Sequence, residues 1–196
     1  MTSSNSNSIS VAISSFILAG GKSRRFGDNK ALYSFRGKPL LIHATEKLEA
    51  HIRKPAIITK EPSLYRHLDY PVLEDTIEQQ NPLAGIHTGL LRSNTNWNFF
   101  LACDMPLITS GVIKRLLDAV DSSPAHTEII VPRTPRSVQP LAGLYHTSLV
   151  NIFLETAGQA NSVRDFIRSR HSLYIDFKSD TPFTNVNTKK DLREIN

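Results

Sequence analysis

The sequence predicts an α/β protein with a doubly wound, Rossmann-like, mostly parallel sheet and helices on both faces. Apolar segments of strand length alternate along the chain with segments of helical period. Several strand segments are apolar at nearly every position, which is typical of parallel strands covered on both faces. Such alternation builds right-handed βαβ units, and the ligands of these sheets bind beyond the carboxyl ends of the strands.

The expected elements follow in chain order. Strands are expected at 11–18, 55–59, 71–73, 97–102, 128–131 and 173–177, and helices at 39–51, 62–68, 83–91, 110–120, 147–157, 162–170 and 189–195. The helix over 110–120 has the clearest pattern, because its apolar residues trace one face. Pro39 and Pro62 suit the first turn of a helix, and Thr188 is a candidate N-cap.

Length and composition are those of one globular domain, with 196 residues of which 40% are hydrophobic and 21% charged. We expect a flexible polar leader at 1–10 and a single domain over 11–196. No apolar stretch approaches the roughly 20 residues of a membrane helix, so no membrane partner is expected. The single cysteine, Cys103, excludes an intrachain disulfide and fits a cytoplasmic location.

Positive charge is concentrated near the start of the chain. The net charge is only +5, but residues 22–38 hold six Lys or Arg against the one carboxylate of Asp28. The rest of the chain is therefore neutral overall. This concentration favours a specific anion site over a diffuse nucleic-acid surface.

The first chemical motif, LAGGKSRRFGDNK, follows the first expected strand. Its spacing matches neither a phosphate-binding Walker loop nor the dinucleotide fingerprint G-x-G-x-x-G. A strand that ends in Gly20 and Gly21 still lets a ligand approach the backbone, where N–H groups can bind an anion. Lys and Arg side chains of the loop would supply charge for phosphate oxygens. The alternative is a surface loop whose cations are only solvated.

Asp104 is the one carboxylate in the apolar run FFLACDMPLI. At the carboxyl end of a buried strand it would be costly unless it is paired or bound to a cation. Mg²⁺ fits this position, because proteins hold it with one or two carboxylates plus phosphate oxygens. Two structural alternatives remain: a cap for the helix that begins near Thr109, and an ion pair with a cation of the first loop.

Two further stretches carry candidate ligand-binding groups. Asp75 ends a short expected strand, and the next helix opens with a segment in which Gly85 and Gly89 leave a bare stripe. That stripe lets either a base or a neighbouring strand approach closely. Near the end of the chain, Asn185 and Asn187 alternate with an apolar residue, so an extended strand would point both amides to one side.

Taken together, the motifs LAGGKSRRFG, FRGKPLL, PLAGI, ACDMP, QPLAGLY and NVNTKKDL occur in an order that resembles the MobA-type molybdenum cofactor guanylyltransferases. The resemblance covers about residues 12–195. Its Leu-Ala-Gly-Gly form looks more like the guanylyl branch than the cytidylyl relatives, which usually carry Leu-Ala-Ala-Gly. The fold it implies is the Rossmann-like one expected above.

The resemblance implies transfer of GMP from GTP to the terminal phosphate of the molybdopterin cofactor, with Mg²⁺ and with release of pyrophosphate. It assigns catalytic roles to Lys30, Asp104 and Arg25, and the metal to Asp104. The nucleotide- and substrate-binding set that it implies is Leu18, Ala19, Gly20, Gly21, Lys22, Lys30, Asp75, Gly85, Asp104, Asn185 and Asn187. Within that set, Asp75 looks like the carboxylate near the guanosine, and the two asparagines like the pterin-binding amides.

The expected partners are GTP, the molybdopterin cofactor, and transient contacts with proteins that deliver the cofactor or mature molybdoenzymes; nucleic acid is not expected, and we expect a monomer. A cytidylyltransferase, a sugar-1-phosphate nucleotidyltransferase and a non-catalytic nucleotide-binding protein are the alternatives. The chain departs from the usual family pattern at Phe26, at Asn81 and at Asn29, where an acid usually precedes the lysine.

Overall fold

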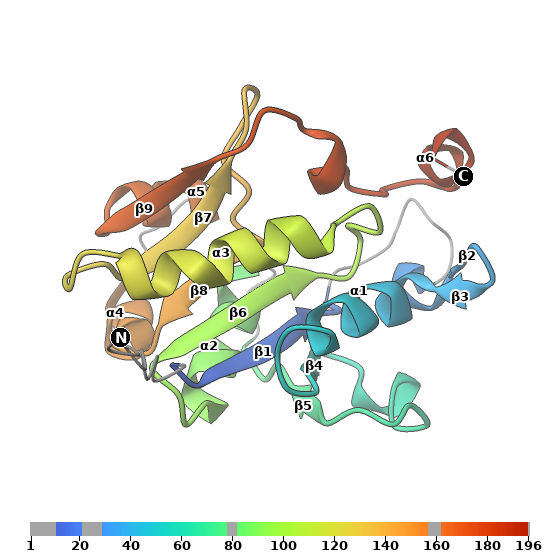
Figure 1. The fold of residues 1–196 in the computed structure, drawn as a ribbon. Coiled ribbons are helices and arrows are strands. Elements are labelled where there is room, and N and C mark those ends of the chain that lie inside the picture. Colours follow the sequence, from blue (N-terminus) through green and yellow to red (C-terminus); the bar gives the residue numbers. More distant parts are fainter. Residues whose placement is uncertain (1–10, 21–28, 78–81, 157–161, 196) are drawn as a thin grey trace, which may run out of the picture.

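A seven-stranded sheet runs through the molecule in the order β5-β4-β1-β6-β8-β7-β9 (Figure 1). The computed structural model describes residues 11–20, 29–77, 82–156 and 162–195, and the expected leader at 1–10 lies outside them. The strands are β1 (Ile13–Leu18), β4 (Ala56–Thr59), β5 (Val72–Glu74), β6 (Trp97–Ala102), β7 (Ile129–Arg133), β8 (Ala142–His146) and β9 (Ser172–Asp176). β8 alone runs antiparallel to its neighbours, so the mostly parallel α/β sheet expected from the sequence is confirmed.

Helices cover both faces of the sheet. The helices are α1 (Leu40–Glu49), α2 (Pro82–Arg92), α3 (Ser110–Ser122), α4 (Leu149–Thr156), α5 (Val163–Arg168) and α6 (Lys189–Glu194). α1 and α3 lie on the near face in Figure 1 and pack on one core cluster, while α2, α4 and α5 pack on a second cluster behind the sheet. None of the helices within the described ranges is long and apolar enough to cross a membrane.

Short elements extend the carboxyl edge of the sheet. A two-stranded ribbon of β2 (Ser34–Phe35) and β3 (Lys38–Pro39) precedes α1, and 3₁₀ turns η1 (Lys30–Leu32), η2 (Pro62–Leu64) and η3 (Thr181–Phe183) connect other elements. Phe35 and Leu40 from this ribbon region pack with Val186 and Leu192 from the end of the chain. This small cluster brings the last segment of the chain beside the β2–β3 ribbon and the start of α1 (Figure 1).

The structure differs from the expected elements most clearly at residues 62–68 and at β8. The helix expected at 62–68 is only the 3₁₀ turn η2, because Tyr65 turns inward and is 1% exposed, which leaves no continuous helical face. The strand β8 was not expected. It is inserted between β6 and β7, where Gly143 is required because a Cβ there would lie 2.7 Å from the Ile130 carbonyl oxygen.

Of the helix starts expected from the sequence, the N-cap at Thr188 is confirmed and the position of Pro39 differs. Thr188 begins α6 with a capping box, in which its side chain accepts from the Asp191 backbone N–H and the Asp191 carboxylate accepts from the Thr188 N–H. Thr109 caps α3 in a similar way. Pro39, expected inside the first turn of α1, instead occupies the N-cap position just before it.

Candidate functional site

The carboxyl ends of the parallel strands meet along one edge of the sheet, where the segments after β1, β4 and β6 are tied together. Ala19 N donates to the Ile58 carbonyl at 2.9 Å, and Cys103 N donates to the Leu18 carbonyl at 3.2 Å. The residue after each strand is thus held by the backbone of its neighbour. The described residues that follow β1 and β6, Ala19 and Cys103, therefore lie at neighbouring strand ends, and Asp104 follows Cys103 there.

Lys30 and Asp104 form an ion pair at the centre of this edge. Lys30 Nζ lies 2.7 Å from Asp104 Oδ2, and each side chain is 19% exposed. Lys30 comes from η1 after the first loop, and Asp104 directly follows β6 and Cys103. One of the two structural alternatives for Asp104, an ion pair with a cation of the first loop, is therefore present.

In this ion pair only one oxygen of the Asp104 carboxylate, Oδ2, has a partner among the described residues. Oδ1 is buried, and no hydrogen-bond donor reaches it among the described residues. A buried carboxylate oxygen without a partner is rare and costly in folded proteins. The capping alternative does not supply one, because Thr109 itself caps α3. The unbonded oxygen fits a cation that arrives with the ligand.

Asn29 and Tyr65 support the turn that carries Lys30. Asn29 is the N-cap of η1, and its Oδ1 accepts from the Ala31 N–H at 3.1 Å. The Tyr65 hydroxyl lies 2.9 Å from Asn29 Nδ2 and 3.0 Å from Asn29 Oδ1. Sequence reasoning missed Tyr65, because 36 residues separate it from Asn29 and no local pattern marks the contact.

The late asparagines reach the same edge. Val186 N donates to the Asp104 carbonyl oxygen at 2.9 Å, so the segment that contains both amides passes directly beside Asp104. Val186 is buried whereas Asn185 and Asn187 are exposed. The strand expected at these residues is not formed, so that prediction is wrong. The expected alternation of one buried and two exposed side chains is present. Two exposed asparagines therefore lie on the segment whose backbone contacts Asp104.

Asp75 lies further along the edge, after β5. Two strands, β4 and β1, separate β5 from β6, which places the strand ends about 14 Å apart at the usual strand spacing. Asp75 Oδ1 accepts from the Ile77 N–H and from the Thr88 hydroxyl, both at 3.2 Å. Asp75 is thus fixed against α2 and is not part of the ion pair. The separation suits two ends of one extended ligand.

The glycines of the two motifs have different surroundings. A Cβ at Gly20 would meet nothing within 4 Å, so its backbone is open. At Gly85 a Cβ would lie 2.8 Å from Leu18 Cδ2, and at Gly89 it would lie 2.4 Å from a ring carbon of Phe100. The stripe on α2 therefore serves close packing of the helix on the sheet.

Three predicted site residues, Gly21, Lys22 and Arg25, lie outside the described residues. Within the described ranges no group of three or more His, Cys, Asp and Glu side chains could hold a metal ion. Burial raises the pKa of the Cys103 thiol to about 12, so it remains protonated and is not a nucleophile. The described chemistry at this edge is that of a cation, a carboxylate and exposed amides.

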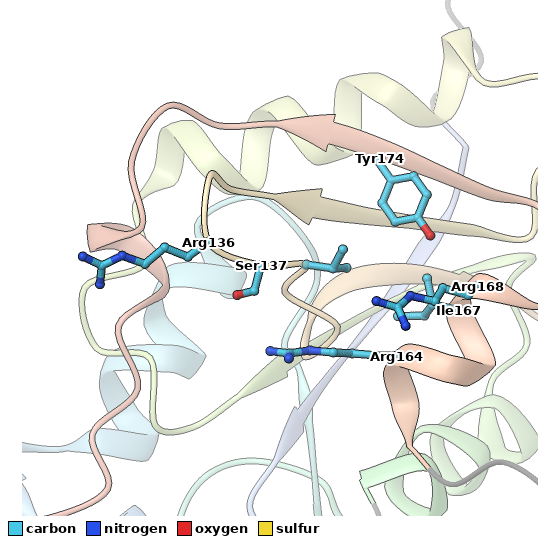
Figure 2. Close-up of a pocket in the computed structure, with 7 residues that line it drawn as sticks. Arg136, Ser137, Arg164, Ile167, Arg168 and Tyr174 are labelled. Carbon is cyan, nitrogen blue, oxygen red and sulfur yellow. The ribbon is translucent and has the colours of Figure 1, made fainter.

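A separate cavity of about 130 Å³ lies beside α5 and β9 (Figure 2). Its lining includes Arg136, Arg164 and Arg168, which come from the loop after β7 and from α5. Arg136 lies 3.7 Å from Asp180, Arg168 lies 3.7 Å from Asp165, and these arginine side chains are 86% and 75% exposed. Two of the three arginines therefore lie near carboxylates and have largely exposed side chains, whereas the Lys30 side chain is 19% exposed.

Comparison with known proteins places this geometry in context. A family model described as the MobA-like NTP transferase domain matches residues 15–173. The molybdenum cofactor guanylyltransferase of Syntrophotalea carbinolica is 33% identical over 189 residues, which cover 92% of this chain and 89% of that protein. The molybdenum cofactor guanylyltransferase of Pasteurella multocida is 31% identical over 191 residues, 94% of this chain and 100% of that protein.

A similar fold occurs in the crystal structure of molybdopterin-guanine dinucleotide biosynthesis protein A from Archaeoglobus fulgidus. The TM-score is 0.77 at 20% sequence identity, and the match covers 92% of this chain and 95% of that one. At this identity the likeness establishes the shared fold.

Proposed function

The chain belongs to the MobA-like NTP transferase domain family, and from that premise we propose that it is a molybdenum cofactor guanylyltransferase. It would transfer GMP from GTP to the terminal phosphate of the molybdopterin cofactor and release pyrophosphate. The observation that carries the proposal at the level of residues is the Lys30–Asp104 pair, with its buried and unbonded Oδ1, at the carboxyl edge of the sheet.

The reaction needs positioning more than covalent catalysis. An oxygen of the acceptor phosphate attacks the α-phosphorus of GTP, a new P–O bond forms, and the bond to the bridging oxygen of the β-phosphate breaks. The electron pair of that bond leaves with pyrophosphate. Because the nucleophile belongs to the substrate, the protein needs no serine or cysteine nucleophile, which agrees with the protonated and buried Cys103.

Lys30 would hold the phosphates. Its ammonium is a mobile donor on a four-carbon chain and can turn from Asp104 Oδ2 toward the phosphate oxygens of a bound nucleotide. There it would offset the negative charge that develops on the leaving pyrophosphate. Lys22 and Arg25 of the first loop would add charge to the same phosphates, with Arg25 as the third catalytic residue.

Asp104 would hold Mg²⁺. The fit rests on the buried Oδ1 that lacks a donor, and on a carboxylate being a preferred ligand of this ion. A single carboxylate is enough when phosphate oxygens supply other ligands, which agrees with the lack of a metal-binding cluster among the described residues. When bound, the ion supplies Lewis-acid stabilisation of phosphate charge.

The remaining predicted residues would divide between the two substrates. Backbone groups of Leu18, Ala19, Gly20 and Gly21 would contact the nucleotide, where the open space at Gly20 permits close approach. Asp75 would lie at the guanosine end, about 14 Å along the edge from Asp104, with Gly85 on the adjoining helix. The exposed amides of Asn185 and Asn187 would face the pterin of the acceptor.

We further propose a cytoplasmic monomer that contacts cofactor-delivery or molybdoenzyme-maturation proteins only transiently. The single cysteine of the chain fits this location. Sedimentation of the purified protein with and without nucleotide tests the monomer directly.

Thermal unfolding with GTP, CTP, ATP or UTP, each with Mg²⁺, tests the substrate. A ligand that binds the native state raises stability by mass action, so GTP should give the largest increase in Tm. At 100 times its Kd, a ligand raises the free energy of unfolding by about 2.7 kcal/mol. A larger shift with CTP would replace the guanylyl assignment by a cytidylyl one. Radiolabelled GTP and molybdopterin cofactor then report the transfer itself.

A further inference from the structure

Tyr65 belongs to the same buried core cluster as a chain neighbour of each member of the central ion pair. It is 1% exposed and packs in the same core cluster as Ala31, which follows Lys30, and Cys103, which precedes Asp104. Its ring enters the core from the segment after η2, far from both in sequence. Through its contact with Asn29, this buried side chain connects the end of η2 with the turn that carries Lys30.

The Tyr65 hydroxyl ends at the N-cap of the turn that carries Lys30. It lies within hydrogen-bond distance of both Nδ2 and Oδ1 of Asn29, at 2.9 and 3.0 Å. The same Oδ1 accepts from the Ala31 N–H at 3.1 Å. Asn29 therefore bridges a hydroxyl fixed in the core and the backbone N–H of Ala31 within η1.

This bridge matters because lysine is difficult to place. Its long side chain has many rotamers and loses conformational entropy when it is held in one position. A fixed backbone at residues 29–31 restricts where the Lys30 ammonium can reach, and Ala31, 3% exposed, anchors the other side of the turn. The 2.7 Å contact with Asp104 is then the outcome of a prearranged turn.

We propose that Tyr65, acting through the Asn29 amide, is a positioning residue that aims Lys30 at the Asp104 carboxylate and at the phosphates bound there. Its catalytic consequence rests on the proposed function, whereas its effect on Lys30 does not. The hydroxyl acts only as a hydrogen-bonding group, since burial raises the pKa of Tyr65 to about 12. Tyr65 does not exchange protons during the reaction.

Tyr65→Phe tests the proposal, with Tyr145→Phe as a matched control. Both tyrosines are fully buried, and the Tyr145 hydroxyl donates to the Pro140 carbonyl at 2.8 Å in the core on the other face of the sheet. Each substitution removes one buried hydroxyl and keeps the ring. Any general loss of stability is therefore shared, and an effect on Lys30 is specific to Tyr65.

Two readouts are measured in each variant. The first is the rate at which acetic anhydride modifies Lys30 relative to the exposed Lys178, followed by peptide mass spectrometry without nucleotide. The second is the kcat/KM for GTP. Tyr65→Phe should raise Lys30 labelling several-fold and lower kcat/KM about tenfold, the worth of one hydrogen bond, while Tyr145→Phe leaves both near the wild-type values.

Variants of Asn29 supply a second test that keeps the buried ring intact. Asn29→Asp retains acceptors for the Tyr65 hydroxyl and the Ala31 N–H and should behave like the wild type, whereas Asn29→Ala should reproduce Tyr65→Phe. Equal Lys30 labelling in Tyr65→Phe, Asn29→Ala and Tyr145→Phe would overturn the positioning role. If the wild type fails to use GTP, the proposed function is wrong, and the labelling comparison still decides the role of Tyr65.

Discussion

Two ion pairs of similar burial lie at opposite edges of the central sheet and differ in how fully their carboxylates are bonded. At the carboxyl edge, Lys30 and Asp104 are each 19% exposed, and Asp104 Oδ1 has no donor. At the amino edge, Arg170 and Glu128 are 25% and 13% exposed. There the Glu128 carboxylate accepts from two Arg170 nitrogens and from the His171 backbone N–H.

This is the difference that we expect between a structural ion pair and a ligand-binding site. Burial alone raises the pKa of Glu128, but the hydrogen bonds from Arg170 and His171 outweigh it, so the pKa lies below the ordinary 4.5. Glu128 is satisfied in the folded chain by itself. Asp104 still has one buried oxygen, Oδ1, without a hydrogen-bond donor among the described residues. Such an oxygen is expected where a bound ligand or ion supplies the missing partner.

The largest expected effect is on catalysis at Asp104. Asp104→Asn removes the negative charge with little change in shape and should lower the rate of GMP transfer by about 10³-fold, as for other groups that stabilise transition-state charge. Glu128→Gln is the matched change at the amino edge and should leave the rate unchanged. Single-turnover assays with labelled GTP measure both, and full activity of Asp104→Asn would remove it from the site.

Substitution of the two cations, Lys30 and Arg170, should also affect catalysis at the carboxyl edge only. Lys30→Met keeps the length of the side chain but loses the ammonium, so kcat/KM for GTP should fall by about 10²-fold. Arg170→Met should leave GTP kinetics as in the wild type. Steady-state kinetics with varied GTP measure the pair, and equal effects of the two substitutions would contradict the distinction between the edges.

For the free energy of unfolding we expect the reverse: the substitution at Glu128 should cost more than the one at Asp104. Glu128→Gln weakens a pair in which every bond is made within the chain and should cost about 1–2 kcal/mol of the free energy of unfolding. Asp104→Asn should cost less, since it removes a charge whose Oδ1 is buried without a partner. Urea unfolding of both variants checks this. A larger loss for Asp104→Asn would mean that its ion pair is chiefly structural.

The smallest expected effect is the pH dependence of stability near neutrality, which arises chiefly from buried histidines. Burial lowers the pKa of His87, which packs against Phe153, below the ordinary 6.5. The unfolded chain then binds the proton more readily, so stability is fully present above pH 6.5 and decreases as pH falls toward the folded-state pKa. His146, whose pKa burial also lowers, acts in the same direction.

His87→Gln should therefore make the Tm less dependent on pH between about 7.5 and 5.5. Glu128→Gln should change that interval less, because Glu128 acts there only through the pKa of His146, on which burial has the larger effect. The contribution of Glu128 is lost only in more acid solution, as pH falls from 4.5 through its lowered pKa. Thermal unfolding in a series of buffers separates the two intervals. An unchanged slope in His87→Gln would assign the neutral-pH dependence to other groups.

Much of the site was predictable because it follows strand ends. Asp75 and Asp104 directly follow expected strands, and parallel strands bring their carboxyl ends to one edge. Gly20 is open, as expected of a backbone that a ligand approaches. Gly85 was less predictable, since the same bare stripe serves ligand approach or packing, and only the 2.8 Å approach to Leu18 reveals the packing.

The sequence by itself determined the fold class, the order of most elements and the cap of α6, because these depend on local periodicity and on side chains within a few residues. The tertiary structure alone decided the insertion of β8 between β6 and β7, the inward turn of Tyr65 and its contact with Asn29. It also decided that Lys30 meets Asp104 across 74 residues and leaves one oxygen unbonded. Such contacts depend on which distant segments share a buried space, and no local pattern encodes that.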